Sequence, residues 1–146
     1  MKRLLISVLI AATTTAALAH SGATGIVKVR MDGMMVLGQS MKTLVGLTKT
    51  GDFDQAAVRE AAKQIQSHSG QAMNERFPEG SLQSVSEAAP AIWQDWDRFI
   101  AISDELFDAA VELENNAANA DFDLADSVKR MGATCSACHE PFRIKK

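Results

Sequence analysis

Several features common in globular proteins are missing from this sequence. There is no tyrosine, and aromatic residues make up only 5% of the chain. No segment alternates apolar and polar residues as a half-buried strand would. After the N-terminal residues 1–19, no apolar run approaches the roughly 20 residues needed to cross a bilayer. These absences exclude a sheet-based fold and a membrane span in the rest of the chain.

Patterns that would indicate an enzyme or a di-iron centre are also absent. The chain contains no Glu-x-x-His pair of the kind that di-iron helical bundles use. No Ser-His-Asp constellation or pair of carboxylates stands out. His20 would be the new N-terminal residue, and His68 lies among polar residues, where we expect it to be solvated. We therefore expect no enzymatic activity and no metal ligand at either histidine.

The N-terminal residues 1–19 have the pattern of an export signal. Lys2 and Arg3 precede a short apolar run, and small residues lead up to Ala19. This arrangement predicts a secretory signal peptide that is cleaved after Ala19. A membrane anchor is the alternative, but the apolar run is too short to span a bilayer. The mature chain, residues 20–146, is then one exported domain.

The charge of the chain is slightly negative. Fifteen Lys and Arg against 18 Asp and Glu give a formal charge of −3, which becomes more negative once Lys2 and Arg3 are removed. This balance disfavours nucleic-acid binding and favours partners with basic docking patches. The one basic cluster, residues 142–146, fits a charge that complements the C-terminus of a helix.

Four segments carry apolar residues three and four positions apart, as in a helix with one buried stripe. The expected helices span residues 25–49, 54–76, 90–118 and 123–143. The stripe of the first is expected to run along Val27, Met31, Met34, Gly38, Met41 and Val45. Asp54 and Asp123 are placed as N-caps. Four long helices with mostly short connections predict an all-α, antiparallel four-helix bundle.

Pro141 conflicts with the last of these helices. A proline inside a helix cannot donate the backbone hydrogen bond to the carbonyl four residues earlier, here that of Ala137. We therefore expect the last turn to be bent or frayed just after His139.

Both cysteines of the chain lie in one motif near the C-terminus, Cys135-Ser136-Ala137-Cys138-His139. A thioredoxin-type redox pair would need a βαβ context, which is absent. A zinc site needs four ligands, and this motif offers at most three. A structural disulfide across so short a loop would add little stability. The remaining interpretation is c-type haem attachment, for which Cys-x-x-Cys-His is the signature.

Helical spacing favours the haem interpretation. Cys135 and His139 are four residues apart and lie on one face of the expected helix, with Cys138 beside them. The apolar stripe of this helix passes through both cysteines, so we expect the motif to face the interior of the bundle. A flat apolar macrocycle could be buried there.

Three segments resemble the class II cytochromes c, the family of cytochrome c′ and of the low-spin cytochromes c-556 and c-554. They are CSACHEPFR (135–143), APAIW (89–93) and VKVRMDGMMVLG (27–38). The resemblance covers essentially the whole mature chain and implies one covalently attached haem c in the bacterial periplasm. It also implies redox partner proteins and a possible homodimer. Pro141 departs from the pattern of this family.

The resemblance implies a role for five residues around the haem. Cys135 and Cys138 would form the two thioether bonds to the haem, and His139 would be the proximal iron ligand. Arg30 would lie near the haem propionates, and Arg143 could assist it.

The sixth position of the iron divides the family. In low-spin members a methionine four residues after the arginine closes this position, and here that residue is Met34. We expect Met34 to be the distal ligand, with the small Gly33 beside it, and the protein to be an electron carrier. Two alternatives stay open, namely another methionine as the ligand, or an unligated site that binds nitric oxide or carbon monoxide as in cytochrome c′.

Overall fold

The structure is a computed structural model, which describes residues 22–51, 53–119 and 121–144. These residues form helices and no named strand. The helices are α1 (Gly25–Thr50), α2 (Gln55–Gln66), α3 (Gln71–Asn74), α4 (Ala91–Gln94), α5 (Trp96–Asn116) and α6 (Leu124–Phe142). None of them combines the length and the apolar character that a membrane span requires. The predicted signal peptide, residues 1–19, lies outside the described residues.

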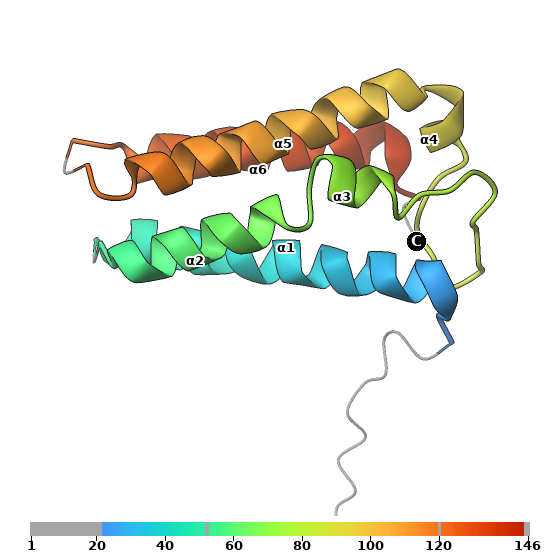
Figure 1. Cartoon of the computed structure of the whole chain (residues 1–146), viewed down its shortest axis with the longest axis horizontal. Coiled ribbons are helices and arrows are strands. Elements are labelled where there is room, and N and C mark those ends of the chain that lie inside the picture. Colours follow the sequence, from blue (N-terminus) through green and yellow to red (C-terminus); the bar gives the residue numbers. More distant parts are fainter. Residues whose placement is uncertain (1–21, 52, 120, 145–146) are drawn as a thin grey trace, which may run out of the picture.

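The four long helices pack as an antiparallel bundle. Figure 1 shows α1 beside α2 in one layer and α5 beside α6 in the other, with successive helices running in opposite directions. The layers are joined because α2 also contacts α5 and α1 also contacts α6. The short helices α3 and α4 lie toward the end of the bundle where α1 begins and α6 ends (Figure 1). The predicted all-α fold is confirmed.

The ends of the helices follow the predicted local chemistry. Asp54 and Asp123 cap α2 and α6, and each Oδ1 accepts a backbone N–H three residues later, at 3.0 Å and 2.9 Å. Such a cap satisfies one of the free donors in the first turn of a helix. Gly51 ends α1 in the left-handed conformation, with φ of 71°, and donates its N–H to the carbonyl of Leu47.

The second predicted helix is interrupted, so the prediction of one continuous helix over residues 54–76 was wrong. The chain turns between α2 and α3, and Gly70 takes a φ of +58°. Gly70 also lies against α5, since its N–H donates to the carbonyl of Ser103 at 3.1 Å and its carbonyl accepts the Ser103 hydroxyl at 3.2 Å. A Cβ on Gly70 would be 3.2 Å from Cβ of Phe107. Only glycine combines this conformation with so close a backbone approach.

The third predicted helix is also divided, into α4 and α5. Asp95 lies between them with φ of −132° and ψ of 54°, outside the helical region. The tryptophans on either side of this break, Trp93 and Trp96, are each held by a contact with another residue. The Trp93 N–H donates to the carbonyl of Phe77 at 2.9 Å, and Trp96 stacks on Phe99 with a centroid separation of 5.3 Å.

Pro141 does not fray the last helix, so that expectation was wrong. Helix α6 continues to Phe142, and the N–H of Arg143 still donates to the carbonyl of His139 at 3.2 Å. The end of α6 is also tied to the loop before α4. The carbonyl of Phe142 accepts the N–H of Ala89 at 2.9 Å, and the carbonyl of Glu87 accepts that of Ile144 at 2.7 Å. These long-range bonds hold the final turn in place.

The buried face of α1 is displaced from the predicted stripe. The buried residues of α1 are Val27, Arg30, Gly33, Leu37, Ser40 and Leu44. Met31, Met34 and Met41 are only half-buried, because they line a cavity. The apolar pattern of α1 therefore combines a face packed against other helices with a face that borders the cavity.

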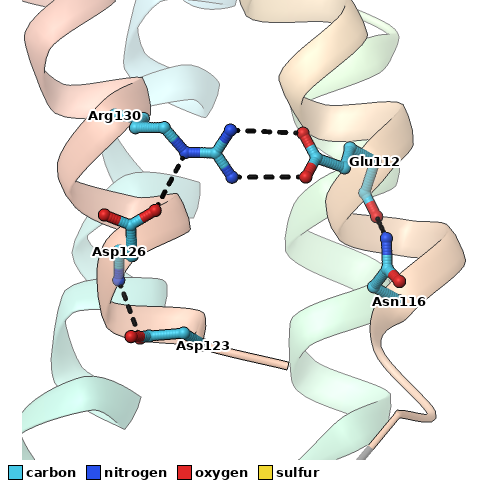
Figure 2. Close-up of polar contacts among 5 residues, drawn as sticks. All are labelled: Glu112, Asn116, Asp123, Asp126 and Arg130. Carbon is cyan, nitrogen blue, oxygen red and sulfur yellow. Dashed lines mark hydrogen bonds and ion pairs between the residues drawn. The ribbon is translucent and has the colours of Figure 1, made fainter. Parts of the chain in front are cut away.

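A polar cluster joins α5 to α6 at the end of the bundle where the two helices connect. Figure 2 shows the guanidinium of Arg130 between Glu112 on α5 and Asp126 on its own helix, at distances of 3.3 Å and 3.2 Å. Both carboxylates raise the pKa of Arg130. All these side chains are exposed, so the cluster adds little stability at physiological salt.

Candidate haem site

A cavity of about 830 Å³ lies at the other end of the bundle. Every helix contributes to its wall, through Arg30 on α1, Ile65 on α2, Met73 on α3, Ile92 on α4, Phe99 on α5 and Cys135 on α6. The loop before α4 closes part of the rim. Its volume is in the upper range of cofactor and ligand cavities, and its wall is mainly apolar with a few polar groups.

Helix α6 brings the three predicted motif residues to this cavity. Cys135, Cys138 and His139 all line it, and the two cysteines are half-buried free thiols. Burial raises the pKa of the Cys135 thiol and, together with the neighbouring charge of Cys135, raises that of Cys138 to about 11. Both groups are therefore neutral thiols at physiological pH.

The imidazole of His139 is at the rim of the cavity. Partial burial lowers its pKa, and the positive charge of Arg143 lowers it further, while the charge of Glu87 opposes both effects. A histidine with a lowered pKa is mostly neutral near pH 7, and a neutral imidazole has a nitrogen lone pair for a metal. His139 is therefore in the protonation state that an iron ligand requires.

Four methionines of α1 line the same cavity. They are Met31, Met34, Met35 and Met41. Met34 is half-buried, as expected for a ligand, but Met31 and Met41 are half-buried too. Met35 is 45% exposed. Met34 therefore lines the cavity, but its burial does not distinguish it from Met31 and Met41.

We had expected Gly33 to leave space beside Met34, but Gly33 does not line the cavity. It faces the segments that follow α2 and α3 instead, where a Cβ would meet Nη1 of Arg76 and lie 3.1 Å from Cδ2 of His68. His68 is therefore half-buried and not fully solvated as predicted. Its Nδ1 lies 2.9 Å from both the Ser67 hydroxyl and the Gln64 carbonyl, and the residue does not line the cavity.

Arg30 is a buried charge with unused hydrogen-bond donors. It is 3% exposed, and its Nη2 donates to the carbonyl and hydroxyl of Ser81 at 2.7 Å and 2.8 Å. The guanidinium carbon lies 4.3 Å from the ring centroid of Phe77. Burial lowers the pKa of Arg30. Its Nε and Nη1 have no partner in the described part of the chain, although buried donors are nearly always bonded.

These features fit haem c. Two adjacent thiols can form thioether bonds, a neutral imidazole follows them in the sequence, and the cavity has room for an apolar macrocycle. The unpartnered donors of Arg30 suit the carboxylate of a haem propionate. A zinc site is less compatible, because no group of three or more His, Cys, Asp or Glu in the described part of the chain could hold a metal ion together.

Arg143 also lines the cavity but already has a partner. Its Nη2 lies 2.6 Å from Oε2 of Glu87 in the loop before α4. The predicted propionate contact of Arg143 would therefore have to share the guanidinium with Glu87. Sequence reasoning identified neither Glu87 nor Ser81, because long-range polar partners leave no periodic pattern in a sequence.

Comparisons with known proteins give consistent similarities. Residues 25–143 match the family model described as Cytochrome C'. The chain is similar to cytochrome c-556 of Agrobacterium fabrum, with 37% identity over 85% of this chain and 84% of that protein. It is 31% identical to a cytochrome c' of Cereibacter sphaeroides over the full length of both. The solved structure of cytochrome c' from Rhodopseudomonas palustris has a TM-score of 0.71 and 27% identity, covering 85% of this chain and 99% of that one.

Proposed function

The chain belongs to the Cytochrome C' family, the class II cytochromes c, and on this basis we propose that it is a low-spin electron carrier of the periplasm. Its cofactor is one covalently attached haem c, as in the members of this family. In the proposed arrangement Cys135 and Cys138 form the thioether bonds, His139 is the proximal ligand, and Met34 is the distal ligand. The haem supplies the ferric–ferrous couple.

The observation that carries this proposal is the meeting of α1 and α6 at one cavity. His139 comes from α6 and Met34 from α1, and both line the same space. A thioether sulfur is a soft ligand that stabilises ferrous iron and raises the reduction potential. Two protein ligands keep the iron environment similar in both oxidation states, which suits a protein that only exchanges electrons. The mainly apolar wall limits the access of water.

Two arginines would hold the haem propionates. Arg30 is the stronger candidate, since its Nε and Nη1 are buried and unpartnered beside the cavity. Its other terminal nitrogen is fixed by Ser81, so the guanidinium is pre-oriented. Arg143 would contribute a second positive charge at the rim, shared with Glu87.

A second function is supported by the similarity of the methionines. Met31, Met34 and Met41 are all half-buried in the wall, so burial alone does not mark one of them as a ligand. Full-length similarity to a cytochrome c' also supports a five-coordinate iron. The protein would then bind nitric oxide or carbon monoxide at the position that Met34 otherwise fills.

Absorption spectra of the holoprotein distinguish the two functions. For the electron carrier we expect a sharp, split visible band on reduction with dithionite, and no change when carbon monoxide is added. Met34→Ala should convert the iron to a high-spin form that binds carbon monoxide. Met35→Ala, which removes a more exposed methionine of the same wall, is the matched control and should leave the spectrum low-spin. A wild-type spectrum that is high-spin and shifts with carbon monoxide would favour the gas-binding function.

The partners of an electron carrier follow from its surface. A formal charge of −3 for the whole chain, with more acidic than basic residues, favours redox partners that present basic patches. A homodimer, as implied by the family resemblance, stays a prediction, and the sedimentation behaviour of the holoprotein would test it.

A further inference from the structure

A second recess lies outside the haem cavity, between α3 and the start of α5. Its volume is about 460 Å³. Its wall combines the indole rings of Trp93 and Trp96, the carboxylates of Glu75 and Glu79, and the side chain of Asn74. None of the residues that could attach or ligate haem lines it. The recess is thus a separate feature with an unusual pairing of aromatic and acidic groups.

The two indole rings are fixed in the wall by other contacts. Trp93 donates its N–H to the carbonyl of Phe77 at 2.9 Å, and Trp96 stacks on Phe99 with an interplanar angle of 16°. They are the only tryptophans of the chain. A pre-oriented indole attracts a cation through its electron-rich face, and it does so more strongly than the ring of any other residue.

The acidic groups of the recess have no basic partner. None of the ion pairs among the described residues involves Glu75 or Glu79. Glu75 accepts only a neutral donor, the amide of Gln71, at 2.8 Å. The nearest base in sequence, Arg76, donates instead to the carbonyl of Ser67 at 3.3 Å, in the turn between α2 and α3. The residues lining the recess therefore include two acidic ones that no basic side chain of the described residues neutralises.

Asn74 adds an acceptor that also lacks a donor. Its Oδ1 is buried and has no hydrogen-bond partner among the residues that the structure describes. An acceptor in this condition is energetically costly, but its burial keeps it from contact with an occupant of the recess. The carboxylates and the indole faces, which belong to residues that line the recess, favour a positively charged group.

We propose that this recess binds a lysine or arginine side chain presented by a protein partner. The cationic group would lie against the indoles and be neutralised by Glu75 and Glu79. Charge complementarity carries the choice of a basic occupant, since no basic residue lines the recess. A neutral or acidic occupant would leave both carboxylates uncompensated.

The position of the recess suits a redox partner. Phe77 lines both the recess and the haem cavity, and Trp96 stacks on Phe99, which is in the wall of that cavity. A partner held at the recess would therefore lie one aromatic layer from the haem. Only this redox identity of the partner rests on the proposed electron-carrier function; the binding of a basic side chain does not.

Nuclear magnetic resonance of the ferrous, ¹⁵N-labelled holoprotein tests the proposal directly. The two tryptophans give two indole N–H signals, both from the recess. Titration with a tetralysine peptide should shift both signals along a saturable curve. Glu75→Gln combined with Glu79→Gln should weaken the apparent affinity by about fivefold or more. Asp104→Asn combined with Asp108→Asn removes the same charge from an exposed part of α5 outside the recess and is the matched control.

Two results would overturn the proposal. One is a titration in which neither indole signal moves. The other is an equal loss of affinity in both double variants, which would mean attraction by net charge and not by the recess. Unchanged absorption spectra and helical circular dichroism establish that the variants are folded. A high-spin, gas-binding spectrum would refute the electron-carrier function while leaving this titration valid, so the two failures are distinguishable.

Discussion

Nη2 of Arg143 lies 2.6 Å from Oε2 of Glu87, and this ion pair joins the end of α6 to the loop before α4. The two residues are 56 positions apart in the sequence. Both line the haem cavity, so the pair places one negative and one positive charge at its rim. The backbone bonds of Ala89 to Phe142 and of Ile144 to Glu87 hold the two segments together.

Replacing Glu87 should raise the reduction potential of the haem. Glu87→Gln removes a negative charge that favours ferric iron and releases the positive charge of Arg143, which favours ferrous iron. We expect a rise on the order of tens of millivolts, because the pair is partly exposed and screened. Arg143→Gln should shift the potential the opposite way. Potentiometric titration measures both shifts.

The control for this prediction removes a carboxylate away from the cavity. Asp108→Asn changes the net charge as Glu87→Gln does, but Asp108 is exposed on α5 and does not line the cavity. Its potential should match that of the wild type within a few millivolts. A shift as large as that of Glu87→Gln would mean that net charge, and not the rim pair, sets the effect.

A side chain at Gly70 should destabilise the fold. Gly70→Ala places a Cβ at a positive φ and 3.2 Å from Cβ of Phe107, and we expect a loss of about 1–3 kcal/mol in the free energy of unfolding. Gly46→Ala is the contrasting change, since this exposed glycine of α1 has nothing within 4 Å of a Cβ. There we expect a gain of about 0.5–1 kcal/mol. Urea unfolding followed by circular dichroism measures both, and a neutral Gly70→Ala would contradict the close approach to α5.

The cap of α6 should matter more than the ion pairs beside it. Asp123→Ala leaves the N–H of Asp126 without its acceptor and should cost about 1 kcal/mol. Asp123→Asn keeps a capping oxygen and should cost much less. Thermal unfolding of the two variants at equal ionic strength checks the difference, and similar melting temperatures would show that the cap is unimportant.

The Arg130 cluster should respond to salt. Arg130→Met removes the contacts to Glu112 and Asp126 that Figure 2 shows, and we expect a small decrease in melting temperature in dilute buffer. Because these charges are exposed, the decrease should vanish near 1 M sodium chloride. A decrease that persists at high salt would point to lost packing of the arginine stem instead.

Phe99 should be the most sensitive aromatic residue of the cavity wall. It is 1% exposed and contacts the rings of Phe77, Trp96 and Phe142 at centroid distances of 4.8, 5.3 and 5.5 Å. Phe99→Ala should cost about 3–5 kcal/mol in the free energy of unfolding. Phe53→Ala, at a residue that is 47% exposed, is the control and should cost little. Denaturant unfolding of the holoproteins compares them.

Most of the fold could be predicted from periodicity because its helices bury regular stripes. The apolar stripe expected to pass through Cys135 continues at helical spacing to Met131 and Val128, and both are buried. The turn at Gly70 could not be predicted, since it depends on hydrogen bonds to Ser103 on another helix. Pro141 was misread for a similar reason, because long-range bonds to the loop before α4 hold the last turn.

Without the family resemblance, the candidate site was predictable only where its residues are adjacent in the chain. Cys135 and His139 lie in one short motif, and the structure brings both to the cavity. The position of Arg30 was expected from family resemblance, but its fixation by Ser81 was not. A contact between residues 51 positions apart leaves no local trace in the sequence. The role of Met34 stays a prediction for the spectra to test.

The make-up of the wall of the haem cavity limits what a fragment of the protein could retain. It draws residues from all six helices, from Arg30 near the start of α1 to Phe142 at the end of α6. No contiguous fragment therefore contains the pocket, although a short peptide carries the whole attachment motif. Grafting that motif onto another helix would transfer the attachment motif but not the enclosure, the buried Arg30 or the methionines of α1. The cofactor's environment is thus a property of the complete tertiary structure.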